Sequence, residues 1–160
     1  MASFDEHINQ AKKNFLLFEF IFNNSNDYLD WCVTICFYVA VHIVNAHSAV
    51  KTNSHYRAHK DIENDLNPFN STPCSVNRAV YTSYIKLSIL SRRARYLLEE
   101  NTTDDSIAHY IKEKHFDKSL KYLDCLLNYF DLEYSLKFPS ISIKYKNLKK
   151  GELKFITKTP

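Results

Sequence analysis

The residues of this chain that are best suited to chemistry lie in two short polar segments. The first reads Ser-His-Tyr-Arg-Ala-His over residues 54–59, and the second reads Ser-Arg-Arg-Ala-Arg-Tyr over residues 91–96. Imidazole exchanges protons near neutral pH, and the planar guanidinium group of arginine matches the oxygens of a phosphate. Cleavage of an RNA backbone needs a proton acceptor and a cation beside the phosphate. The two segments therefore point to chemistry on phosphodiesters.

A polar stripe continues the second segment along a predicted helix. Tyr84, Ser88, Arg92 and Arg95 follow one another at steps of three and four residues, which places them along one side of that helix. The first segment should open a short helix whose N-terminus favours anions, and it must pack nearby for the chain to close. We therefore predict His55, Arg92 and Arg95 as the catalytic residues.

The C-terminal segment, residues 137–160, is strongly basic. It holds seven lysines and one glutamate, whereas the rest of the chain has a net charge of −3. Such a segment suggests contact with an anionic partner, although a merely solvated tail has the same composition. The predicted nucleic-acid contacts are Tyr84, Ser88, Arg57, Lys149 and Lys150.

Simpler interpretations exist for the same residues. Arg92 and Arg95 could pair with Glu99, Asp27 or Asp30 and only tie helices together. His55 and His59 are spaced to share a metal ion, but no third ligand is suitably placed, so we expect neither a metal site nor a cofactor. The cysteines form no Cys-x-x-Cys pair, and we expect them to be free thiols.

The elements that must position these side chains are predicted to be helices. The chain has a single glycine, Gly151, which argues against a fold rich in tight turns and against phosphate-binding glycine loops. Apolar residues recur at helical spacing over 4–22, 76–97 and 116–134. Ser3, Ser54 and Ser75 are expected to be helix N-caps. After Pro139 the apolar residues alternate, which predicts a short β-hairpin around residues 149–151.

A helix over about 30–46 is apolar on every side. It is either a membrane span or the centre of a bundle. The unbroken apolar run from Trp31 to Val41 is too short for a span, and Asp5, Glu6, Lys12 and Lys13 occupy the place of a signal-peptide core. We therefore expect an all-α antiparallel bundle of about five helices over residues 1–136, with a basic hairpin extension over residues 137–160, in the cytoplasm and away from membranes.

The order of these motifs resembles the HEPN superfamily, the higher eukaryotes and prokaryotes nucleotide-binding domain. The resemblance rests on the Asp-Trp-Cys-Val-Thr run from Asp30 to His42, on Ser54-His55, and on residues 91–96, and it covers about residues 5–134. It implies a helical bundle that pairs into a homodimer. Many members are metal-independent ribonucleases of defence and toxin systems, whereas others only bind partners. The family motif, an arginine followed after four to six residues by a histidine, is absent here.

Two functions follow as expectations from the residues and the resemblance. The first is an RNA-directed protein, acting as a metal-independent endoribonuclease in a phage-defence or toxin–antitoxin system. The alternative is a non-catalytic HEPN module that dimerises and regulates a partner protein of such a system. The missing arginine-to-histidine motif favours the second function, and the stripe of tyrosine, serine and arginine favours the first.

Overall fold

The computed structural model describes residues 2–54, 56, 58–96 and 112–159 of the chain. The chain is 69% helical, which confirms the predicted helical bundle with a short C-terminal strand extension. The elements in chain order are α1 (Phe4–Asn24), a short 3-10 helix (Asn26–Tyr28), α2 (Leu29–Thr52), α3 (His59–Leu66), α4 (Arg78–Tyr96), α5 (Lys112–Tyr134), β1 (Ile141–Ile143) and β2 (Ile156–Lys158).

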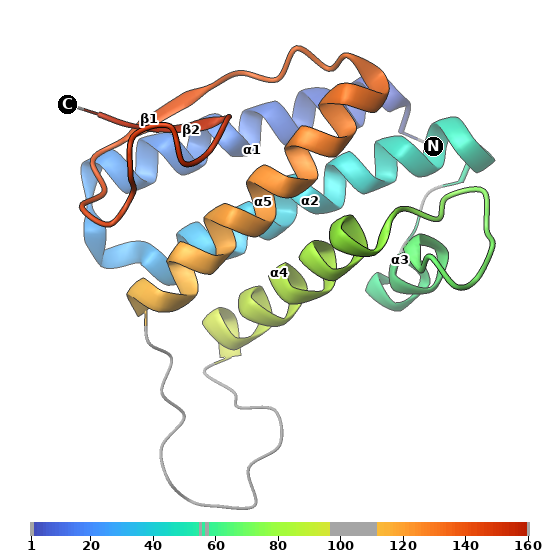
Figure 1. Cartoon of the computed structure of the whole chain (residues 1–160), viewed down its shortest axis with the longest axis horizontal. Coiled ribbons are helices and arrows are strands. Elements are labelled where there is room, and N and C mark those ends of the chain that lie inside the picture. Colours follow the sequence, from blue (N-terminus) through green and yellow to red (C-terminus); the bar gives the residue numbers. More distant parts are fainter. Residues whose placement is uncertain (1, 55, 57, 97–111, 160) are drawn as a thin grey trace, which may run out of the picture.

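Helix α2 is the centre of the bundle. It packs against α1, α4 and α5, and α1 lies antiparallel to it along the outer side (Figure 1). By length and composition α2 is apolar enough to cross a membrane, but 67% of its apolar stretch is buried inside the molecule. A helix that is apolar on every side can be the centre of a bundle. The burial of α2 between three other helices agrees with that prediction.

The polar residues on α2 are satisfied by other parts of the chain. The buried His47 ring donates from Nε2 to the carbonyl oxygen of Cys74, 3.1 Å away, so its Nδ1 accepts from the Tyr134 hydroxyl at 2.6 Å. The Asn45 side chain accepts from the backbone N–H of Tyr56 at 3.0 Å. Because buried polar groups need partners, these bonds hold the segments before α3 and α4, and the end of α5, to α2.

The helix starts agree with the sequence-based caps in one case out of three. Ser3 and Glu6 form the predicted capping box on α1. Ser54 caps no helix, because α3 begins at His59 after a segment tied to α2 through Tyr56. Ser75 does not cap α4 either, since the Asn77 side chain accepts the Val80 N–H at 3.0 Å and takes that role.

The C-terminal extension is not a hairpin. Strands β1 and β2 pair in parallel, with Ile141 opposite Ile156 and Ile143 opposite Lys158. Parallel strands cannot be joined by a tight turn, so residues 144–155 form a crossover. The turn predicted near Gly151 does occur, with the Glu152 N–H bonded to the Lys149 carbonyl, but it lies within this crossover.

The extension shares the core of the bundle instead of forming a separate unit. The side chains of Phe138, Ile141, Ile143 and Phe155 are buried in the same hydrophobic cluster as those of the helices. Asp124 on α5 accepts the backbone N–H groups of Lys154 and Phe155 at 3.0 and 2.9 Å. On the other side of β1, Glu19 and Asn23 of α1 bind the backbone of residues 142 and 144. These side chains cover an edge that would otherwise be open to other strands.

The burial of His47 predicts a loss of stability in mild acid. Burial lowers the pKa of His47 below the 6.5 of an exposed histidine, so below pH 6.5 the unfolded chain binds more protons than the folded one. The contribution of His47 to the free energy of unfolding should therefore be complete above pH 6.5, and it should be lost progressively as the pH drops below that value. Urea unfolding between pH 5 and 8 measures this dependence, with most carboxylates ionised throughout.

His47→Gln is the variant for this test, with His115→Gln as the matched control on α5. We expect His47→Gln to cost about 1–3 kcal/mol at pH 7.5, because buried partners are left unpaired, and to flatten the dependence on pH. An unchanged pH dependence in His47→Gln would show that another group causes the acid sensitivity.

Candidate functional site

A pocket of about 260 Å³ lies between the start of α2 and the end of α4. Asp30, Trp31 and Thr34 line it from α2, and Arg95 and Tyr96 line it from α4. The two aromatic side chains are far more exposed than a core role requires, with Trp31 at 58% and Tyr96 at 60%. The pocket therefore combines a guanidinium group with two accessible aromatic rings.

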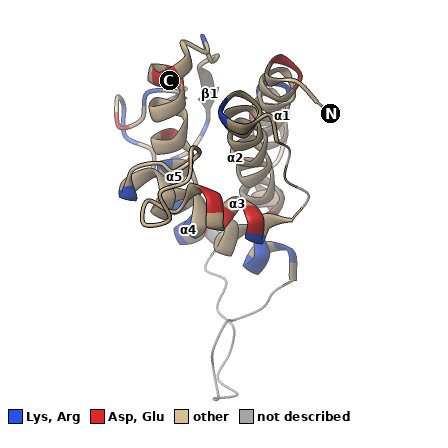
Figure 2. Cartoon of the chain, turned by 90° about the vertical axis from the view of Figure 1, so that its right-hand side faces the viewer, with Lys and Arg blue, Asp and Glu red and all other residues tan. Residues whose placement is uncertain are grey.

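Arg95 belongs to this pocket and has no ion pair with Asp27 or Asp30 in the described part of the chain. Its Nε donates to the Ser91 carbonyl at 3.4 Å, and its guanidinium carbon lies 5.2 Å from the centre of the Tyr96 ring. Glu99, the third predicted partner, lies outside the described residues. Arg92 is exposed on the same turn of α4, and Figure 2 shows the basic ribbon at this end of the helix.

The predicted catalytic histidine, His55, lies outside the described residues. Among the described histidines, His59 is the one whose pKa responds to the charge of Arg95. It is the first residue of α3, its ring lies 5.1 Å from the ring of Phe37 on α2, and it is exposed to solvent. Partial burial and the charge of Arg95 lower the pKa of His59, while Glu63 acts against them. A pKa below 6.5 leaves the His59 ring mostly neutral at pH 7, and the charge of the Arg95 guanidinium group acts on it.

The structure corrects the prediction for Tyr84. Its ring is fully buried and lies 5.7 Å from the ring of Phe37 on α2. Tyr84 and Arg92 lie along the same side of α4, but Tyr84 points toward α2 and Arg92 is exposed. A buried ring cannot stack on a nucleobase, so Tyr84 is a core residue. Burial raises the pKa of its hydroxyl, and that oxygen has no hydrogen-bond partner among the described residues. Ser88 is half-buried on the same side of α4.

The other predicted residues do not join this pocket. His55 and Arg57 lie outside the described residues. Lys149 and Lys150 are exposed on the crossover between β1 and β2, which packs on α1 and α5. They remain candidates for phosphate contact, at a different place from Arg95. His42 is half-buried on α2, and its Nδ1 lies 3.2 Å from Nδ1 of His7 on α1.

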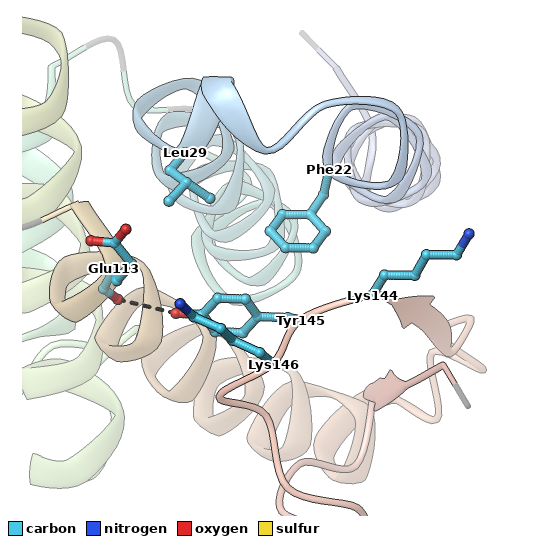
Figure 3. Close-up of a pocket in the computed structure, with 6 residues that line it drawn as sticks. All are labelled: Phe22, Leu29, Glu113, Lys144, Tyr145 and Lys146. Atoms are coloured by element: carbon cyan, nitrogen blue, oxygen red, sulfur yellow. Dashed lines mark hydrogen bonds between the residues drawn. The ribbon is translucent and has the colours of Figure 1, made fainter.

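A second pocket, of about 230 Å³, lies where the extension meets α1, α2 and α5. Phe22, Leu29 and the ring of Tyr145 form its apolar wall, and Lys144, Lys146 and Glu113 stand at its edge (Figure 3). Tyr145 is buried and its hydroxyl donates to Asp117 on α5, so it anchors the extension and is not available for stacking. With a carboxylate at the edge, this pocket is less suited to a phosphate than the one at Arg95.

The thiols and potential metal ligands offer little chemistry among the described residues. No group of three or more histidine, cysteine or acidic side chains that could hold a metal ion is found there. The four cysteines are free, and burial raises the pKa of Cys32 to about 12. A thiol with so high a pKa is a poor nucleophile at neutral pH.

Comparison of the chain with protein-family models, with curated proteins and with solved structures finds no match.

Sequence reasoning missed two residues that line the Arg95 pocket, Trp31 and Tyr96, and it missed the histidine whose pKa responds to Arg95, His59. His59 was considered only as a partner of His55 in a metal site, and Trp31 and Tyr96 only as parts of motifs. The sequence does contain a signal for an accessible Trp31. The residue lies in the first turn of a helix, directly after Asp30, and the first turn of a helix is covered by fewer neighbours than its middle. The approach of α3 to the end of α4 has no such signal.

The unpaired hydroxyl of Tyr84 generates a prediction that separates its core role from a binding role. Tyr84→Phe removes a buried hydroxyl without a partner and keeps the ring, so the free energy of unfolding should stay equal or rise by up to about 1–2 kcal/mol. Thermal and urea unfolding measure this change. Tyr81→Phe, on the half-buried side of α4, is the matched control. A clear loss of stability in Tyr84→Phe would mean that the hydroxyl has a partner.

Proposed function

We propose that this chain is an RNA-directed protein of the HEPN type that cleaves RNA without a metal ion, with Arg95 and His59 at its centre. One observation carries the proposal: the Arg95 guanidinium group lines a pocket with two exposed aromatic rings, and its charge acts on the imidazole of His59, which comes from a different helix. Cations and aromatic faces are the two features that single-stranded nucleic acids require of a binding surface.

The proposed chemistry uses these groups as follows. The neutral ring of His59 takes the proton of a ribose 2′-hydroxyl, whose oxygen attacks the adjacent phosphorus. Arg95 binds the phosphate oxygens and stabilises the charge that develops on them, and Arg92 adds a second cation. The bond to the 5′-oxygen breaks, that oxygen takes a proton from solvent, and a 2′,3′-cyclic phosphate remains. Trp31 and Tyr96 hold neighbouring bases by stacking.

The proposal also draws on the motif resemblance described above. The family pattern places its histidine a few residues after its arginine in the sequence, and this chain lacks that spacing. A histidine from α3 that reaches the same arginine would supply the missing group in space. The resemblance further suggests a place in a bacterial or phage conflict system.

Removal of the two central side chains tests the proposal. With total RNA and tRNA as substrates and EDTA present, we expect the wild type to produce ends with a 2′,3′-cyclic phosphate. His59→Ala should lower the rate by about 10²–10⁴-fold and leave RNA affinity nearly unchanged, because a general base acts on the transition state. Arg95→Ala should weaken both. Because the pKa of His59 is lowered, the wild-type rate should persist to a lower pH than an ordinary histidine base would allow.

Arg78→Ala, at the opposite end of α4, is the matched control, and its cleavage and affinity should equal those of the wild type. The single tryptophan, Trp31, adds a direct readout, since RNA in this pocket should quench its fluorescence. Full cleavage by His59→Ala would remove the proposed base. Absence of both cleavage and binding in the wild type would favour the second candidate function.

The second candidate is an interaction module, and the outer face of α1 favours it. The side chains of Leu16, Leu17 and Phe20 are exposed there, at 50%, 47% and 65%. Neighbouring exposed apolar side chains are typical of protein interfaces. We propose that a second copy of the chain covers this face in a two-fold homodimer, the commonest closed symmetry. This dimer is compatible with either function, because the face lies on α1 and the Arg95 pocket lies between α2 and α4.

Substitution of Phe20 tests the dimer. Light scattering at tens of micromolar should give twice the 18.8 kDa of one chain for the wild type. Phe20→Lys should give a single chain, because a buried unpaired charge opposes association. Leu132→Lys changes an 80% exposed leucine on α5 and should leave the dimer intact. A wild-type mass of one chain would contradict the proposal.

A further inference from the structure

A third pocket lies on the opposite side of the end of α4 from Trp31, between α4 and α5. Its volume is about 180 Å³. Lys86 and Arg93 line it from α4, and His115, Lys118 and Tyr122 line it from α5. The two α4 residues are two helical turns apart, as are His115 and Tyr122, so both helices contribute a continuous edge.

All the ionisable side chains at this pocket, apart from the tyrosine, are basic. No carboxylate lines it among the described residues, and Lys86, Arg93 and Lys118 make no ion pair there. Like charges gathered in one hollow repel each other and raise the local concentration of anions. Three other lysines of the described residues, Lys51, Lys121 and Lys154, are each paired with a carboxylate.

Arg93 provides a second, independent observation. Its Nε is buried, and it has no hydrogen-bond partner among the described residues. A buried donor on a charged group is costly to leave without an acceptor. Because Arg93 also lines the pocket, a small shift of its side chain toward an anion bound there would give this donor an acceptor.

We infer that this pocket binds a phosphate group of the same single-stranded RNA that occupies the Arg95 pocket, and in this respect the inference rests on the proposed function. The fork of Arg93 matches two phosphate oxygens, and Lys86 and Lys118 add point charges. Tyr122 gives an aromatic wall for the adjoining ribose or base. An acidic protein segment would need matching acidic groups at several points, whereas one concave hollow of this size suits a single compact anion.

The position of the pocket on α4 supports one continuous strand. Arg93 and Arg95 lie on opposite flanks of the last turns of α4, and the exposed Arg92 lies between them. A helix with its side chains is about 10–12 Å wide. A strand that crosses the end of α4 would therefore meet Arg95, Arg92 and Arg93 in turn, and the pocket beyond would hold it in register for cleavage near His59.

The test measures RNA affinity separately from cleavage. The probe is a fluorescein-labelled single-stranded RNA with 2′-O-methyl groups, which cannot be cut by the proposed reaction. Fluorescence anisotropy gives its affinity over a range of KCl concentrations. The test variant is Lys86→Gln/Arg93→Gln/Lys118→Gln, and Lys86→Gln/Lys118→Gln is a milder version that keeps the half-buried arginine. The matched control, Lys13→Gln/Arg78→Gln/Lys137→Gln, removes the same three charges from exposed positions elsewhere.

We expect the triple variant to bind at least tenfold more weakly at low salt, and the milder variant to show a smaller loss. The slope of log affinity against log salt should become shallower by about 0.7, since the pocket neutralises one phosphate and each neutralised phosphate of a single strand contributes about 0.7. The control should stay within twofold of the wild type. Equal RNA affinity of the wild type and both pocket variants would overturn the inference.

Three further outcomes identify the partner and separate the two proposals. If poly-glutamate binds the wild type as tightly as RNA, and both bindings are lost in the pocket variants, the pocket serves an acidic protein and the phosphate assignment is wrong. If 2′-O-methyl RNA binds through this pocket but unmodified RNA is not cut, the pocket stands and the ribonuclease proposal fails. If RNA is cut and the pocket variants cut and bind like the wild type, only the pocket fails.

Discussion

The structure depends on the need to enclose α2 on nearly all sides. A helix with this little polar surface gains most of its stability from burial, at about 25 cal/mol for each Å² of apolar surface removed from water. One neighbouring helix could not provide that, and α1, α4 and α5 together do. Enclosure also buries the polar side chains of Asn45 and His47, which therefore need hydrogen-bond partners within the protein. The bonds that satisfy them fix the segments leading into α3 and α4, and hence where the ends of those helices lie.

The position of α3 has the largest consequence for the proposed site. Tyr56 is held by Asn45 on α2, and its hydroxyl donates to Asp65 within α3. This pair of contacts places the first residue of α3 over Phe37 and near Arg95. The acidic positions on the ribbon of α3 contrast with the basic positions at the end of α4 (Figure 2), and the charge of Glu63 acts on His59. An imidazole that stays neutral beside an arginine therefore results from the way α2 is packed.

Local patterns predicted most of the fold, and long-range contacts decided what they missed. The apolar stripes located α1, α4 and α5, because helical periodicity is a local property of the sequence. The parallel pairing of β1 with β2 was not predicted, since alternation of apolar residues identifies strands but not their partners. The backbone bonds from Asp124, Glu19 and Asn23 that hold this pairing come from distant positions. In the same way, Tyr84 shares a stripe with Arg95, yet only the packing of α4 on α2 shows that its ring faces inward.

The way β1 lies along α1 has a consequence for how the protein is made. The strand β1 is translated well after Glu19 and Asn23, the α1 residues that bind it, with separations of 123 and 119 residues along the chain. Domains commonly begin to fold during synthesis, and contacts between distant residues form late. Until the extension has been made, the bundle would expose the apolar surface that Phe138, Ile143 and Phe155 cover. A nascent chain would thus depend on chaperones until these residues emerge, and loss of the extension would be far more damaging than its small number of residues suggests.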